Sequence, residues 1–302
     1  MANELINLQD INELTTKLVF KNYDSASLLK RLGADSLNEN VDEFKLTYTG
    51  EATVLGESDP KPLAGIESDT IAVQRAKAVH AVHITEEALR ARGASYVLQD
   101  ISAQAAANLL WSIDKAVLLG VSDSESNAAR ALQEIAIAPN AKKIEETDDP
   151  QQDFIDLVFS TGEPDSKVII SNDYFTKLGK IRNKMTGESL YKLSSNRDFT
   201  INSSQVVYAK GLGYENWYPS RNRKERNTLV PNDIQAVTGP WGDIKLNLSA
   251  LSTKIFREAF GEEQLSKKNE VVILNEIFFD VLVPETNDFV ALKSKSEDAA
   301  TS

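Results

Sequence analysis

The chain has 302 residues, of which 41% are hydrophobic and 26% are charged, which is typical of a globular protein. It contains no cysteine and no apolar run of about eighteen residues, so disulfides, thiolate metal sites, cysteine nucleophiles and membrane-spanning helices are excluded. Its net charge of −12, from 45 acidic and 33 basic side chains, argues against tight general binding to nucleic acid but is compatible with enclosing it.

Residues 1–43 have the character of an N-terminal arm. Leucine and isoleucine recur at helical spacing between Leu5 and Leu18, which predicts a short amphipathic helix. Residues 25–33 predict a further helical turn or two. Because few aromatic residues are available to fill a core, we expect this arm to lie over another part of the protein.

Residues 44–84 predict a long two-stranded β-ribbon. Apolar and polar residues alternate at its start, a polar tip with prolines follows at residues 56–62, and the return strand is expected at residues 66–84. Such a ribbon is marginally stable alone, and its open edges invite pairing with another chain. We therefore expect it to contact neighbouring subunits. The candidate contact residues at its tip are Glu57, Asp59 and Lys61.

The longest predicted helix spans residues 94–119. An apolar stripe, a polar opposite face and a run of alanines favour a helix of roughly 38 Å, long enough to act as a spine. A weaker helix start precedes it at Thr85, and Gly93 interrupts that segment. Residues 120–149 are expected to form an acidic loop.

An α/β segment follows this loop. Asp149 and Pro150 predict a helix start, with an N-cap and a proline at the first helical position. Residues 168–170 predict a short buried strand, after which Ser171 or Asn172 caps a second helix. A turn is expected at Gly187. Short strands are expected at residues 206–208, 234–237, 244–248, 271–274, 278–283 and 289–292. Residues 294–302 are expected to form a polar tail.

Two motifs suggest ligand chemistry only weakly. His80 and His83 are the only histidines. If they lay in a helix, they could form a metal site with Glu86 and Glu87 just beyond them. In a strand, two residues three positions apart face opposite sides of the sheet, and no such site would form. Gly211-Leu212-Gly213 lacks the third glycine and the Lys-Ser/Thr ending of a phosphate loop, so a turn beside a strand is the better interpretation. No nucleophile-elbow sequence is present either. We therefore expect no enzyme, no cofactor and no metal.

A basic cluster follows three aromatic residues at positions 214, 217 and 218. The cluster consists of Arg221, Arg223, Lys224 and Arg226. Basic residues beside aromatic ones can hold single-stranded nucleic acid, but the acidic remainder of the chain disfavours that as a main activity. We expect instead an electrostatic contact between subunits, because arginine and aromatic residues are enriched in interfaces. Its candidate partner, the acidic stretch 145–156, is equally well interpreted as a solvated loop running into a helix start.

The order of these elements resembles that of the tailed-phage major capsid proteins. Residues 52–62 look like the tip of the extended loop of that family. Residues 168–191 are similar to its axial-domain strand, helix and turn, and residues 271–292 resemble its closing strands. Each motif is loose alone, but together they cover about residues 44–293 in a fairly specific order and spacing.

The resemblance implies an α+β chain with the Hong Kong 97-like capsid fold. This fold comprises an N-terminal arm, an extended β-ribbon loop, a spine helix with a peripheral domain, and an axial α/β domain. The implied boundaries are 1–43 for the arm, 44–84 for the ribbon, 85–122 and 229–274 for the peripheral domain, 123–228 and 275–293 for the axial domain, and 294–302 for the tail.

The resemblance also implies a function, that of the major capsid protein of a tailed bacteriophage. Copies of the chain would assemble through pentamers and hexamers into an icosahedral shell around double-stranded DNA, without sequence-specific binding. Portal, scaffolding and decoration proteins are implied as further partners. The protein would be assembled in the host cytoplasm and reside in the virion, with no membrane contact.

Some members of the family join subunits by an isopeptide bond between a lysine and an asparagine. Lys61 lies in the corresponding loop, but no asparagine or glutamate of this chain can be matched to that chemistry. Glu57 and Lys61 are therefore more simply interpreted as a charged contact with a neighbour.

Two alternatives remain open. An encapsulin-like nanocompartment shell protein shares the fold and encloses protein cargo, although no cargo pocket can be identified in the sequence. An α/β hydrolase or nucleotide-dependent enzyme would need a pocket of converging polar groups, for which the sequence offers little.

Overall fold

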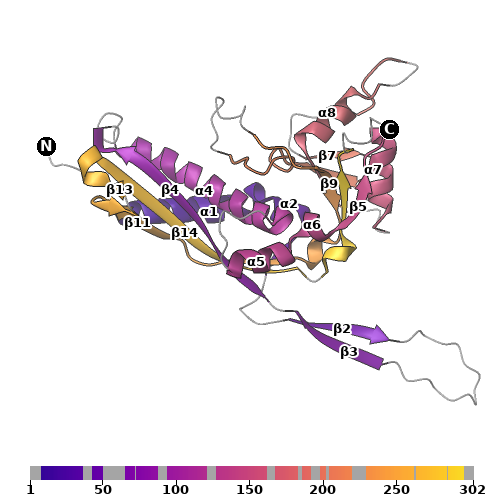
Figure 1. Ribbon diagram of the computed structural model, residues 1–302, viewed down its shortest axis with the longest axis horizontal. Coiled ribbons are helices and arrows are strands. Elements are labelled where there is room, and N and C mark those ends of the chain that lie inside the picture. The colour runs from indigo at the N-terminus through magenta and orange to yellow at the C-terminus, as the bar shows by residue number, and fades with distance from the viewer. Residues whose placement is uncertain are drawn as a thin grey trace, which may run out of the picture.

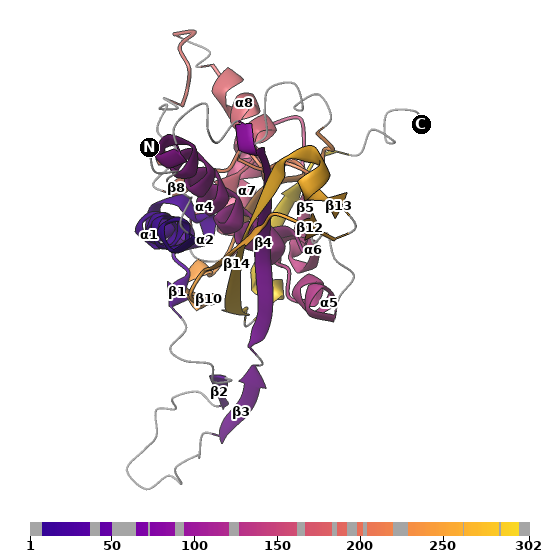
Figure 2. The ribbon, with the colours of Figure 1, turned by 90° about the vertical axis from the view of Figure 1, so that its left-hand side faces the viewer.

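Two β-sheets and one long helix build the body of the protein, and a two-stranded ribbon stands away from it (Figures 1 and 2). Helix α4 (Ala94–Leu119) lies along the five-stranded sheet, and the six-stranded sheet lies with α7 (Pro150–Phe159) and α8 (Asn172–Lys180) at the other end. The computed structural model describes residues 8–36, 43–49, 65–71, 73–87, 94–120, 127–161, 167–182, 186–191, 198–201, 204–219, 229–261, 263–283 and 285–295.

Two helices, α1 (Leu8–Ala26) and α2 (Leu28–Leu32), form most of the described part of the N-terminal arm. Both pack against α4, and Val19 and Leu29 are fully buried there. The predicted amphipathic helix and the additional turn are thus confirmed. The short strand β1 (Asp35–Ser36) then joins the arm to the five-stranded sheet.

A buried carboxylate holds α2 against α4. Asp114 accepts hydrogen bonds from Ser27 Oγ at 2.8 Å and from the backbone N–H groups of Leu28 and Leu29 at 2.7 and 3.3 Å. Burial raises the pKa of Asp114 to about 7, and the hydrogen bonds, which favour the charged form, counteract this only in part. The arm is therefore attached to the spine helix by a polar anchor as well as by apolar contacts.

The ribbon is shorter than the sequence predicts. Strand β2 (Glu43–Thr49) pairs antiparallel with β3 (Gly65–Ile71), whereas β4 (Gln74–Thr85) pairs along its whole length with β14 (Glu270–Leu282) in the body. The prediction of one return strand over residues 66–84 is therefore wrong beyond β3. Alternation indicates a half-buried strand without naming its partner, and here the inward-facing Ala76 and Ala78 are buried against the body.

Strand β14 is the central strand of the five-stranded sheet. Besides β4 it pairs with β10 (Lys245–Leu248) and β11 (Ser252–Phe256), and β1 pairs with β10 in parallel. The sequence predicted two strands here, with a break at residues 275–277. The strand continues through these residues because its ladder with β4 is unbroken from Glu270 to Val281, and Asn275 Oδ1 accepts a hydrogen bond from Thr253 Oγ1 in the interior.

A short hairpin stands at the end of this sheet where β4 ends and β14 begins. It is made of β12 (Ala259–Phe260) and β13 (Glu263–Gln264), followed by a turn of 3-10 helix, η3 (Leu265–Lys268). Leu265 is fully buried beneath the hairpin, which fixes it on the sheet.

The six-stranded sheet is built from strands that are distant in the sequence. In spatial order these are β5 (Lys142–Glu145), β15 (Val290–Lys293), β9 (Ile234–Thr238), β6 (Val168–Ile170), β8 (Ser204–Tyr208) and β7 (Asp198–Ile201). The predicted caps are confirmed, because Asp149 accepts from the first N–H groups of α7 and Ser171 from Tyr174 N in α8. The 3-10 turns η2 (Trp241–Asp243) and η4 (Thr286–Asp288) flank this sheet.

The expectation of a loop at residues 120–149 is wrong. This segment contains α5 (Asn127–Glu134), α6 (Ile137–Asn140) and the edge strand β5. Both helices are short, and α6 contains Pro139, which weakens the sequence signal. They form because Leu132 and Ile137 are buried in the core and Asn140 donates hydrogen bonds to three backbone carbonyl groups.

One continuous hydrophobic core joins the two sheets, as Leu109 of α4, Ile169 of β6 and Ile277 of β14 belong to the same cluster. Sheet membership differs from the domain boundaries expected from the sequence. Strand β9 lies in the six-stranded sheet although it was expected in the peripheral domain, and the expected boundary between residues 274 and 275 falls inside β14.

Replacing Gly239 with alanine should lower the free energy of unfolding by about 1–3 kcal/mol, because the new methyl group would overpack the core. A Cβ atom there would lie 2.3 Å from Phe289 Cδ1, and that ring is buried against Trp241. Gly242→Ala is the control, since nothing lies within 4 Å of its Cβ position, and a change within about 0.5 kcal/mol is expected. Urea unfolding of both variants checks this, and equal stabilities would contradict it.

Candidate assembly surfaces

The first candidate surface is the projecting ribbon. Among the described strands, β2 and β3 pair only with each other, with Thr49 opposite Gly65 at the distal end. Each strand therefore has one edge that no described strand covers, and such an edge can accept a strand of another molecule. The predicted tip contacts Glu57, Asp59 and Lys61 lie outside the described residues.

The second candidate surface is the basic cluster Arg221, Arg223, Lys224 and Arg226, which also lies outside the described residues. Its two flanking segments lie side by side, because Glu215 N donates to Val230 O at 2.9 Å. Trp217 packs edge to face on Trp111 of α4, and Trp111 Nε1 donates to Trp217 O at 2.7 Å. One of the three aromatic residues before the cluster thus serves the core rather than a surface.

The acidic stretch expected to face the basic cluster is largely used within its own subunit. Asp149 caps α7, and Asp153 is buried and accepts from Thr147 N and Oγ1. Glu146 is buried and forms an ion pair with Lys177. These contacts favour the alternative interpretation, in which the stretch is a loop running into a helix start.

The third candidate surface is the outer face of β4 and β14, which sequence reasoning missed. Val79 and Phe278 are 45% and 49% exposed. Ion pairs frame them, Arg75 with Asp280 at 2.6 Å and Glu276 with both Lys77 and Lys254 at 2.8 Å. Hydrogen bonds from the two lysines hold the pKa of Glu276 below its usual value. An exposed apolar pair with a charged rim is typical of protein interfaces.

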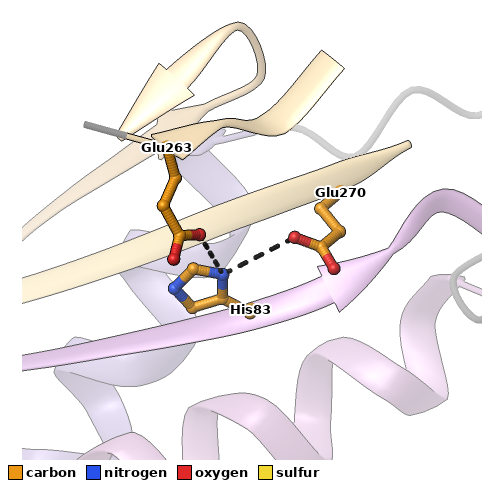
Figure 3. A group of neighbouring side chains, drawn as sticks. All are labelled: His83, Glu263 and Glu270. Carbon is orange, nitrogen blue, oxygen red and sulfur yellow. Dashed lines mark ion pairs between the residues drawn. The ribbon is translucent and has the colours of Figure 1, made fainter. Parts of the chain in front are cut away.

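The two histidines lie on opposite faces of β4, as predicted. His80 is half buried with Nε2 2.8 Å from Asn108 Nδ2, and burial lowers its pKa. His83 is exposed on the other face, where its Nδ1 lies 4.0 Å from Glu263 Oε2 and 3.9 Å from Glu270 Oε2 (Figure 3). Sequence reasoning examined only the glutamates next to the histidines, so it missed these partners.

A cavity of about 280 Å³ lies between the arm, α4 and the segment after β8. Its walls are mostly apolar or aromatic, with Arg31, Tyr208 and Lys210 as the polar contributors. Among the described residues that line it there is no serine, threonine, histidine, aspartate or glutamate. Gly211 and Gly213 lie in a turn after β8, which confirms the predicted turn beside a strand.

No helix in the described part of the chain is long and apolar enough to span a membrane. No family model matches the sequence, and no curated protein matches it.

Solved structures from phages match almost the whole chain. One from Mycobacterium phage Ogopogo has a TM-score of 0.63 at 20% identity, covering 89% of this chain and 92% of that chain. One from Gordonia phage Cozz has a TM-score of 0.65 at 16% identity, covering 90% and 87%. The capsid of a native GTA particle has a TM-score of 0.55 at 11% identity, covering 90% and 91%. The α+β, Hong Kong 97-like capsid fold expected from the sequence is thereby confirmed as the fold of this chain.

Proposed function

We propose that the chain is the major capsid protein of a tailed bacteriophage. It would assemble through pentamers and hexamers into an icosahedral shell that encloses double-stranded DNA. The observation that carries this proposal is the match over about nine tenths of both chains to phage structures and to a GTA capsid. A fold alone does not fix a function, so the free ribbon is the second support: it is a feature that a neighbouring subunit would complete.

The role is structural rather than catalytic in this proposal. The described lining of the cavity beside α4 contains no serine, threonine, histidine or carboxylate, and the acidic chain, with a net charge of −12, would enclose DNA without adhering to it. Copies of the chain are the main partners, and portal, scaffolding and decoration proteins are further partners. Assembly would take place in the host cytoplasm.

The proposal also assigns parts of the chain to the shell. The six-stranded sheet with α7 and α8 would be the axial domain, and the five-stranded sheet with α4 the peripheral domain. Contacts between subunits would involve the ribbon tip, with Glu57, Asp59 and Lys61, and the basic cluster. The exposed Val79 and Phe278 would be covered by a neighbour.

Purified chain should form closed shells or rings of five and six subunits in negative-stain electron microscopy. Obligate interfaces bury about 2,000 Å² or more, so assembly should persist on dilution once shells close. A monodisperse monomer or dimer under every assembly condition would refute the proposal. Denaturing electrophoresis of the particles should give one band at the subunit mass, because no crosslinking partner of Lys61 can be matched.

A further inference from the structure

Three side chains from three separate segments converge at the far end of the five-stranded sheet. His83 comes from β4, Glu270 from the start of β14 and Glu263 from the short hairpin strand β13 (Figure 3). Their ligand atoms all lie within 4.8 Å of one another. We propose that these residues form a binding site for a divalent transition-metal ion, with Zn²⁺ as the best match.

The spacing of the three groups is close to that of a formed site. A tetrahedral ion with ligand distances of about 2.1 Å places its ligand atoms about 3.4 Å apart. His83 Nδ1 lies 4.0 and 3.9 Å from the glutamate oxygens, so rotations of the three side chains would bring the ligand atoms closer to this spacing. His83 and Glu263 are exposed, and Glu270 is partly buried.

Two of the three ligands are held by rigid backbone. In the β4–β14 register His83 is opposite Val272, and Glu270 is two residues before Val272, so both side chains lie on the same face. The His83 ring also packs edge to face against Phe260 of β12, at 6.2 Å between ring centres. The histidine therefore faces the carboxylates before any ion arrives.

The charges of the two glutamates favour binding of a cation. Two carboxylates meet here, and Lys268 Nζ lies 3.8 Å from Glu263 Oε2. A divalent ion would relieve the repulsion between Glu263 and Glu270, and it would compete with Lys268 for the Glu263 oxygen. Removal of the Lys268 charge should therefore tighten metal binding.

The donor set selects the class of metal. One imidazole nitrogen and two carboxylate oxygens suit Zn²⁺ and Co²⁺, whereas Ca²⁺ and Mg²⁺ prefer oxygen ligands alone. Three protein ligands leave one position for water. Because Glu263 belongs to the hairpin and the other two ligands to the main sheet, a bound ion would tie the hairpin to the β4–β14 pair.

The test is a titration of the tag-free, metal-stripped full-length chain with CoCl₂ and ZnCl₂. We expect one ion per chain, visible as the absorption of four-coordinate Co²⁺ and displaced by Zn²⁺. His83→Ala should abolish the signal, and Glu263→Gln and Glu270→Gln should each weaken binding about tenfold or more. The chain has only one other histidine, His80, on the opposite face, so histidine ligation reports on His83.

Two further variants keep the result unambiguous. Lys268→Met should tighten binding, and Glu258→Gln, an exposed change one residue before the hairpin, should leave binding unchanged. Circular dichroism checks that every variant is folded. Absence of binding at millimolar Zn²⁺, or unchanged binding by His83→Ala, would overturn the proposal whether or not the chain forms shells.

Discussion

Replacing Asp114 with alanine should lower the free energy of unfolding of the unassembled chain by about 3–5 kcal/mol. The change leaves Ser27 Oγ and the N–H groups of Leu28 and Leu29 without their acceptor in the interior, and each such loss costs about 1–3 kcal/mol. Part of the loss is recovered by local relaxation. Denaturant unfolding followed by circular dichroism measures the effect.

Asp114→Asn is the matched variant, since it keeps the shape of the side chain and should cost much less. Its amide oxygen can still accept from Leu28 N, and its NH₂ group can donate to Ser27 Oγ. If Asp114→Asn lowered the free energy of unfolding as much as Asp114→Ala, the hydrogen bonds would not be the source of the stabilisation. No loss from either variant would contradict the role of Asp114 as the anchor of α2.

A comparison of the wild-type chain with Asp114→Asn tests how stability depends on pH. The pKa of Asp114 is raised from 3.8 to about 7 in the folded chain, so folding takes up a proton between these values. The stability that Asp114 contributes is therefore fully present at low pH and is lost as the pH rises towards 7. Relative to Asp114→Asn, the wild-type chain should lose about 2–3 kcal/mol between pH 5 and pH 8. A parallel pH dependence of the two proteins would refute the raised pKa.

Shortening the ribbon should abolish closed shells and leave the subunit folded. Thr49 and Gly65 face each other at the distal end of β2 and β3, so residues 50–64 can be replaced by a two-residue Asn-Gly turn that matches the hairpin. The described strands of the two sheets and the described core residues come from other parts of the chain. Circular dichroism and thermal unfolding check the fold, and negative-stain microscopy checks the shells.

A control variant distinguishes the effect of the side chains in residues 50–64 from the effect of the length of this segment. A Gly/Ser-rich segment of the same length restores reach but lacks Glu57, Asp59 and Lys61, and it should also fail to give stable shells. Normal shells from the shortened chain would show that the ribbon tip has no role in assembly. Normal shells from the Gly/Ser variant alone would show that these three side chains are not the contacts.

Elements with strong local signals could be predicted from the sequence. Helix α4 has the predicted bounds of residues 94 and 119 because it is rich in helix formers and glycines flank it, and Gly120 adopts a left-handed conformation with φ 66°. The caps of α7 and α8 could be predicted for the same reason, since a cap is a contact between residues two or three positions apart.

Features that depend on distant partners could not be predicted. The alternation in β4 is the same whether its partner is β3 or β14, and the ion pair of Arg75 with Asp280 joins residues 205 positions apart. The convergence of His83 with Glu263 and Glu270 depends on the same pairing. A single sequence contains no signal for the choice of partner, which is made by burial in the assembled core.

The antiparallel pairing of β4 with β14 has a mechanical consequence for the proposed shell. Strand β3 ends at Ile71 and β4 begins at Gln74, so a pull on the ribbon by an adjacent molecule passes directly into β4 (Figure 1). The twelve paired positions of the ladder lie along β4, so a pull along this strand loads them in shear, all at once, rather than peeling them apart singly. The force needed to pull β4 away from β14 is then set by the length of this ladder. A proline placed within β4 should reduce this force.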